Sequence, residues 1–173
     1  MPQVKVEELV MAPAAQVWAS WADFGNIDRF HPGITGSRLI NGSAPEGLGA
    51  MRQCDMSANG KQYVRERVTD IVENRLMVID IFEATVPIKT ATATLELSEV
   101  RDGFTLVTMT MNFKPSMGLL GAMMAPMMKM QFRKMLQQVL RSNADFVVHG
   151  VEISRAKSKR SGPVGAGVSS PNP

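Results

Sequence analysis

The sequence contains one cysteine, Cys54, and only two histidines, His31 and His149, which are far apart along 173 residues. A single cysteine excludes an internal disulfide framework and any zinc site built from several cysteines. Two separated histidines do not suggest a metal site either. We therefore expect neither a metal ion nor an organic cofactor, and the composition is compatible with a reducing compartment.

Long hydrophobic runs and clusters of basic residues are also missing. No stretch of about 18 uninterrupted apolar residues occurs, which predicts that no segment spans a membrane. The first residues, MPQVKVEELV, alternate and lack the apolar core of a signal peptide. The net charge is +3, and the one dense basic run lies at residues 155–160, outside the expected domain. These absences argue against a nucleic-acid partner and predict a cytoplasmic protein.

Methionine is abundant where aromatic residues are few. The chain has 14 methionines against one tyrosine and two tryptophans, and seven of the methionines fall between Met117 and Met135. Methionine is unbranched and polarizable, so a wall built from it can repack around apolar partners of different shapes. Three interpretations of this segment remain open. They are a pocket wall or lid, plain core packing, and a patch for a membrane surface or protein partner, which the interleaved Lys129, Arg133 and Lys134 suggest.

The hydrophobic periodicity predicts a strand at Gln3–Val10 and then a helix that begins after Pro13. Breaking residues follow, and the segment GNIDRFHPGI predicts a second short helix. From residue 34 to residue 113 the period changes to two, with turn residues between the runs. Six further strands are expected, at Thr35–Ile40, Ala50–Met56, Gln62–Val72, Leu76–Phe82, Lys89–Leu97 and Phe104–Phe113.

The period returns to 3.6 after Pro115, and we expect the main length of a helix to run from Pro126 to about His149. About 24 residues span roughly 36 Å, which is long enough to cross a curved sheet. Glycines make the segment before Pro126 a weak or kinked helix. We expect residues 1–154 to form one domain and the Ser-, Gly- and Pro-rich residues 155–173 to be a disordered basic tail.

Together these elements predict an α+β helix-grip fold, in which a seven-stranded curved antiparallel sheet wraps around a long C-terminal helix, with two short helices after the first strand. One helix does not easily fill a strongly curved sheet, so we expect an apolar cavity between them; a fully packed core is the alternative. Alternation turns Ile79, Ile81 and Glu66 inward. Glu66 is the most informative polar position, because a short carboxylate is not buried without a partner.

The order of these elements and several local motifs resemble the START/Bet v 1-like (SRPBCC) superfamily, and its polyketide cyclase/dehydrase-like branch most of all. The motifs, which span about residues 3 to 150, are AAQVWASWADFGNIDRFHPGI, GLGAMRQ, VRERVTDI, TATATLEL and TMTMNF. The resemblance implies that Glu66 and Arg52 lie in the cavity and that Lys89 lies near its mouth. The chain departs from related plant hormone receptors at Gly36, where they carry a lysine, and from many cyclase-like members at Met109, where they carry tryptophan.

We therefore expect a small hydrophobic molecule, lipid-like or polyketide-like, to bind inside the cavity without chemistry by the protein. The alternatives are a cyclase or dehydratase that moves protons with Glu66, Arg52 or His31, and an interaction module that uses the methionine segment. The ion pair of Arg52 and Glu66 also has a purely structural interpretation, and His31 one as a turn cap. The oligomeric state stays open. The expected ligand-binding residues are Arg52, Cys54, Met56, Val64, Glu66, Ile79, Ile81, Lys89, Ala91, Val107, Met109, Met111, Met128, Phe132, Met135 and Val139.

Overall fold

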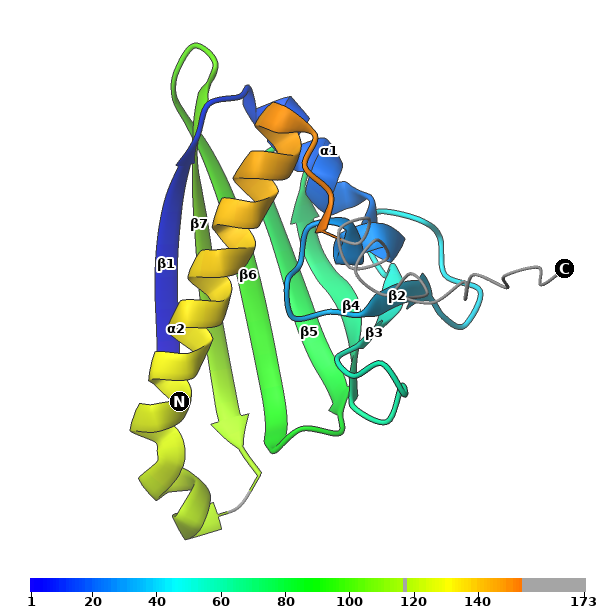
Figure 1. Ribbon diagram of the computed structural model, residues 1–173, viewed down its shortest axis with the longest axis vertical. Coiled ribbons are helices and arrows are strands. Elements are labelled where there is room, and N and C mark those ends of the chain that lie inside the picture. Colours follow the sequence, from blue (N-terminus) through cyan, green and yellow to red (C-terminus); the bar gives the residue numbers. More distant parts are fainter. Residues whose placement is uncertain (117, 154–173) are drawn as a thin grey trace, which may run out of the picture.

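The chain folds as one antiparallel sheet that packs against one long helix (Figure 1). The computed structural model describes residues 1–116 and 118–153. The predicted disordered tail, residues 155–173, lies outside the described residues. The elements are β1 (Gln3–Val10), α1 (Ala14–Ala22), η1 (Phe24–Arg29), β2 (Gly36–Leu39), β3 (Met51–Asp55), β4 (Tyr63–Val72), β5 (Leu76–Ala84), β6 (Ile88–Arg101), β7 (Phe104–Pro115) and α2 (Gly118–His149).

The strand order is β1-β7-β6-β5-β4-β3-β2, and every neighbouring pair is antiparallel. Strands β2 to β7 therefore form a meander, and β1 adds to the edge that β7 would otherwise expose. Tight turns join the strands where the backbone can adopt a positive φ, as at Asn74 (61°) and Gly103 (74°). The predicted seven-stranded helix-grip fold is confirmed.

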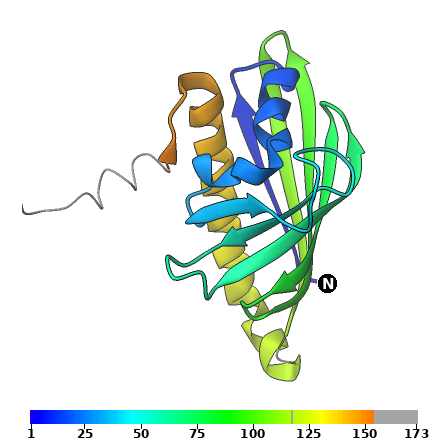
Figure 2. The same cartoon turned by 90° about the vertical axis from the view of Figure 1, so that its right-hand side faces the viewer.

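The sheet curls around one face of α2, as the edge-on view shows (Figure 2). Alternation decides which side chains meet the helix. In β7, the inward positions Val107, Met109, Met111 and Phe113 are all buried, in agreement with the predicted face. Burial of such apolar side chains supplies most of the free energy that holds the sheet on the helix.

Helix α2 joins the weak helical segment expected before Pro126 to the main length expected after it. It begins at Gly118 and continues through Pro126 to His149, so its 32 residues span roughly 48 Å. Pro126 therefore lies inside one continuous helix instead of beginning it, and the main length reaches His149 as predicted. Pro126 is exposed and removes only one backbone hydrogen bond, so the neighbouring residues keep the helix continuous.

The short helices α1 and η1 close one end of the sheet against the C-terminal half of α2. The Trp21 indole donates to Asn143 Oδ1 at 3.0 Å, and Asn143 in turn donates to Ser20 Oγ at 2.7 Å. The rings of Trp21 and Phe146 both pack against Phe30, with centroids 5.0 and 5.7 Å away. These contacts close one end of the sheet. The first turns of α2 lie at the opposite end.

Candidate functional site

A cavity of about 450 Å³ separates the sheet from α2. This volume falls in the range of small-molecule sites, roughly 300–1,000 Å³. The wall is largely apolar, and the polar or charged side chains on it, besides the Trp21 indole, belong to His31, Arg52, Glu66 and Gln131. Such a wall suits a mostly hydrophobic occupant with a small number of hydrogen-bonding groups.

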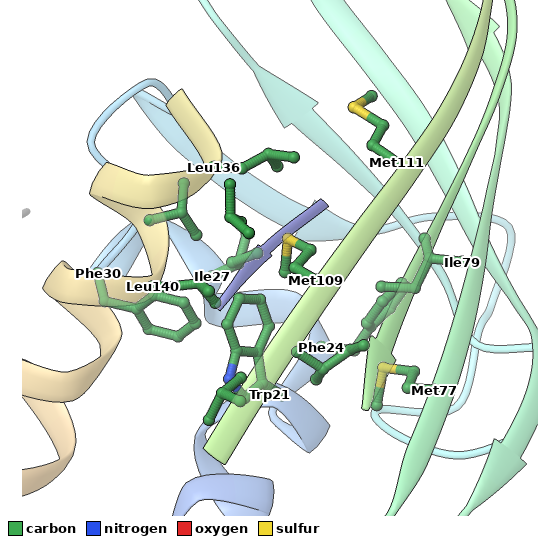
Figure 3. Packing of buried hydrophobic residues seen from close by; sticks show 14 of the residues in the cluster. Trp21, Phe24, Ile27, Phe30, Met77, Ile79, Met109, Met111, Leu136 and Leu140 are labelled. Carbon is green, nitrogen blue, oxygen red and sulfur yellow. The ribbon is translucent and has the colours of Figure 1, made fainter. Parts of the chain in front are cut away.

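The sheet side of the cavity is built from inward positions of several strands. Six of the residues expected there line it, namely Met56, Val64, Ile79, Ile81, Met109 and Met111. Figure 3 shows Ile79, Met109 and Met111 projecting from the sheet toward Ile27 of η1 and Leu136 of α2. Because side chains alternate along each strand, these residues share the concave face while their neighbours face solvent.

The helix side follows the predicted stripe. Met128, Phe132, Met135 and Val139 all line the cavity, at a spacing that places them on one face of α2. The Phe132 ring packs edge-on against Phe113 of β7, with centroids 4.6 Å apart. That contact anchors the helix to the sheet along one side of the cavity.

Arg52 and Glu66 form the charged part of the wall. They are direct cross-strand partners on β3 and β4, and Arg52 Nε donates to Glu66 Oε2 at 2.6 Å. Arg52 Nη1 also donates to the Phe24 backbone carbonyl at 3.0 Å, and its guanidinium lies 3.9 Å from the centroid of the Phe24 ring. Burial disfavours the charge on Arg52, but the Glu66 carboxylate outweighs that effect and raises the pKa of Arg52. Arg52 therefore keeps its charge, and its bond to the Phe24 carbonyl holds the pair against η1.

One oxygen of the Glu66 carboxylate remains accessible from the cavity. Oε2 accepts the Arg52 bond and lies 3.7 Å from Cys54 Sγ, whereas no hydrogen bond within the described residues reaches Oε1. Every fully buried side-chain nitrogen or oxygen of the described residues has a partner, so Oε1 keeps contact with open space. The Glu66 side chain is 12% exposed and lines the cavity. The arrangement thus offers one strong hydrogen-bond acceptor to an occupant.

His31 lies on the wall and also stabilises the turn around Pro32. Its Nδ1 accepts the Gly33 backbone N–H at 3.1 Å. A neutral imidazole that accepts at Nδ1 carries its proton on Nε2. The turn-cap interpretation of His31 therefore agrees with the geometry, and its place on the wall keeps it within reach of a bound molecule.

Four of the expected ligand-binding residues do not line the cavity. Cys54 is completely buried behind the Glu66 carboxylate. Ala91 pairs with Phe113, whose contact with Phe132 closes the space beside it. Val107 lies beyond Met109, toward the end of the sheet where α1 packs. Lys89 is exposed, because the pairing of β6 with β7 shifts register between Ile88 and Thr90 and turns it outward.

Other wall residues were not among the 16 expected ligand-binding residues, although Met124 and Met127 belong to the methionine segment for which a pocket wall was one interpretation. Trp21, Ile27 and Ile34 come from the helices and the connection after β1, whose inward faces cannot be assigned by a period-two pattern. Val86, Pro87 and Ile88 line the cavity from the turn between β5 and β6. The remaining lining residues are Ala93, Pro115, Met124, Met127, Gln131 and Leu136. The helical stripe and the period of β6 do point to Leu136 and Ala93, but the turns give no such signal.

The cavity opens at the end where the β5–β6 turn, the end of β7 and the first turns of α2 meet. Met124 and Met127 line it and are also 41% and 45% exposed. Within the described residues, no group of three His, Cys, Asp or Glu side chains is arranged to hold a metal ion. The helices of the same residues include none with the length and hydropathy needed to cross a membrane.

A curved seven-stranded sheet that grips one long helix defines the START/Bet v 1 class of folds. Solved structures of other proteins show the same fold. The START superfamily protein from Mycobacterium smegmatis is 15% identical, with a TM-score of 0.70 and 84% of this chain and 96% of that chain covered. Ara h 8.0201 is 18% identical, with a TM-score of 0.65 and coverage of 84% and 97%. XoxI from Bacillus cereus is 18% identical, with a TM-score of 0.71 and coverage of 86% and 97%.

Within that class the chain belongs to the family described as polyketide cyclase / dehydrase and lipid transport, whose family model matches residues 1–145. The matched residues include all seven strands and most of α2. The predicted family is therefore confirmed. No curated protein sequence matches the chain.

Proposed function

We propose that the protein binds a small, largely apolar molecule, lipid-like or aromatic, in the cavity between the sheet and α2. The observation that carries this proposal is the cavity itself, about 450 Å³ of space with an almost wholly hydrophobic wall. A well-packed interior rarely leaves voids much larger than a water molecule. A space of this size is therefore best explained by an occupant.

The charged pair supports a more specific expectation about that occupant. Arg52 donates through Nε to Glu66 and through Nη1 to the Phe24 carbonyl, so the pair is internally neutralised. It presents the open Glu66 Oε1 as an acceptor and Arg52 Nη2, which no hydrogen bond within the described residues uses, as a donor. A neutralised pair with one open acceptor and one open donor favours a ligand with a hydroxyl or phenol group, which both donates and accepts, over an ionised one. The preferred ligand is a neutral apolar molecule with one hydroxyl or phenol group.

Uptake of a fluorescent fatty alcohol tests this proposal. Ala93 lines the cavity from β6, whereas Thr92 follows the opposite face of the same strand. We expect Ala93→Phe to fill part of the cavity and weaken uptake at least tenfold, while Thr92→Phe leaves it unchanged. Equal uptake by both variants would mean that the probe binds elsewhere. Native mass spectrometry of protein purified from its own cell should then reveal the natural ligand as a copurifying mass.

A cyclase or dehydratase is the second candidate, and one observation favours it. Glu66 presents an open carboxylate oxygen inside an apolar cavity, where His31 also lies on the wall, so both are placed to exchange protons with a bound chain. In that case Glu66→Gln should abolish turnover and preserve binding. Unchanged turnover in Glu66→Gln would remove Glu66 as the base.

The free thiol of Cys54 supports a reducing compartment such as the cytoplasm. We propose residues 1–154 as the unit that binds the ligand, since the wall residues fall between Trp21 and Val139. Expression of this segment alone should retain uptake of the fatty alcohol, and loss of uptake would assign a role in binding to the residues that follow.

A further inference from the structure

Four methionines on the first described turns of α2 face outward. We call Met123, Met124, Met127 and Met130 the methionine ridge. Their exposed fractions are 80%, 41%, 45% and 54%. Met123, Met127 and Met130 follow one another at the i, i+4, i+7 spacing that places them on one side of the helix. Large apolar side chains that gather in this way on a surface mark an interaction site.

The ridge is continuous with the mouth of the cavity. Met124 and Met127 belong to both, since they are exposed and also line the cavity, whereas Met123 and Met130 do not line it. Pro87 and Ile88 line the mouth opposite, from the turn between β5 and β6. An apolar path over Met124 and Met127 therefore leads from the exposed ridge into the interior.

The charged residues on the same helix as the ridge have one sign until Asp145. The charged residues of α2 before Asp145 are Lys129, Arg133, Lys134 and Arg141, all basic. Lys129, Arg133 and Lys134 are exposed, and in the described part of the chain none of the three has an ion-pair partner. An apolar strip beside unpaired cations is complementary to an anionic lipid surface, where methionines enter the acyl boundary and cations meet the headgroups.

We propose that the methionine ridge docks the protein on a membrane that contains anionic lipid, with the cavity mouth turned toward the bilayer. This inference rests on the proposed function, because a lipid-like ligand dissolved in the membrane would then enter the cavity without crossing water. A lipid surface fits better than a protein partner. The unpaired Lys129 and Lys134 beside the ridge decide between the two, because lysine is depleted at protein interfaces and is favourable at an anionic lipid surface.

Vesicle co-sedimentation of the full chain tests the docking. We expect binding to vesicles of phosphatidylcholine mixed with phosphatidylglycerol, and little binding to phosphatidylcholine alone. Met123→Gln/Met130→Gln should weaken binding to the mixed vesicles at least tenfold. Met11→Gln/Leu48→Gln is the matched control, because those residues are 61% and 67% exposed but lie outside α2, and it should bind as the unchanged protein does.

A second variant tests the contribution of the cations to vesicle binding. Lys129→Gln/Lys134→Gln should weaken binding to the mixed vesicles and remove most of its dependence on salt concentration. Equal binding of the unchanged protein to both vesicle types would overturn the role assigned to the cations. Equal losses in the ridge variant and its matched control would overturn the role assigned to the ridge.

Failure of the docking is distinguishable from failure of the proposed function. Uptake of the fatty alcohol from solution should be the same in the unchanged protein and in Met123→Gln/Met130→Gln, since neither residue lines the cavity. Uptake without vesicle binding would overturn the docking alone. Vesicle binding without uptake would instead count against the proposed ligand site. Sedimentation of the unchanged protein as an oligomer that the ridge variant dissociates, without vesicle binding, would assign the ridge to a second copy of the chain.

Discussion

Glu66 shows what can be learned from one position in a strand. Its apolar neighbours on alternate positions turn it inward, and an inward carboxylate requires a partner. The family resemblance implies that this partner is Arg52 on the neighbouring strand. The structure places the two side chains opposite each other on β3 and β4. The third partner, the Phe24 carbonyl, could not be predicted, because η1 approaches the strand through a contact between residues 28 positions apart.

Replacing one member of the Arg52–Glu66 pair should lower the free energy of unfolding more than replacing both members. Glu66→Ala leaves the Arg52 charge buried and should lower the free energy of unfolding by about 3 kcal/mol, whereas Arg52→Met/Glu66→Leu should stay within about 1 kcal/mol of the unchanged protein. Urea unfolding of the three proteins measures both values. A loss in Glu66→Ala no larger than that in the double variant would mean that solvent in the cavity screens the pair.

The Cys54 thiol predicts a specific dependence of stability on pH. Burial, reinforced by the Glu66 carboxylate, raises the pKa of Cys54 from 9.0 to about 12. Between these two pH values the unfolded chain has lost the thiol proton and the folded chain retains it. The contribution of the Cys54 thiol to the free energy of unfolding is therefore complete below pH 9.0. Between pH 9.0 and about 12 this contribution falls by about 1.4 kcal/mol per pH unit.

Urea unfolding of the unchanged protein and of Cys54→Ala, compared from neutral to alkaline pH, isolates this contribution because all other titrating groups are shared. The difference in stability between the two proteins should shrink above pH 9.0. A constant difference would contradict a protonated thiol in the folded state. Consistent with burial, the folded thiol should also resist alkylation at neutral pH.

At the scale of elements, periodicity predicted the kind and order of the segments better than their ends. All seven strands follow the expected order, but β6 continues to Arg101, four residues past the expected end at Leu97. Pairing with β7 sustains those residues, even though they expose apolar side chains such as Val100. Helix α2 likewise continues through Pro126, where the sequence predicts a change from a weak or kinked segment to the main helix. Local sequence signals mark where an element is able to end, whereas its neighbours decide where it does end.

Pro126 gives this point a test. A proline inside a helix removes one backbone hydrogen bond and costs up to about 3 kcal/mol, so Pro126→Ala should raise the free energy of unfolding by about 1–3 kcal/mol and increase helical circular dichroism. Gln138→Ala is a control on an exposed position of the same helix and should change stability by less than about 0.5 kcal/mol. No gain in Pro126→Ala would mean that the stable part of α2 begins at the proline.

At the scale of the whole molecule, the sequence predicted a cavity but not all of its wall. Twelve of the 16 expected residues line it, because the faces of the strands and of α2 follow from their periods. The exceptions depend on long-range packing. Val107 and Ala91 face inward as expected, but α1 and the Phe113–Phe132 contact fill the space in front of them. The mouth was missed because turns such as Val86–Ile88 have no period.

The same difference between cavity and packed core predicts how the interior tolerates added volume. Met109 and Val107 are both inward on β7 and both nearly inaccessible, at 5% and 1% exposure, yet only Met109 borders the cavity. The larger ring in Met109→Trp can enter existing space, so its stability should stay within about 1 kcal/mol of the unchanged protein while uptake of the fatty alcohol falls. Val107→Trp meets packed atoms and should lower the free energy of unfolding by about 1–3 kcal/mol, with the expanded core lowering the midpoint of thermal unfolding.

If both variants lose stability equally, the space beside Met109 closes in solution and the proposed ligand site has no room for a ligand. If Met109→Trp alone keeps its stability and loses uptake, the cavity is a standing feature of the fold, held open by the curvature of the sheet over α2.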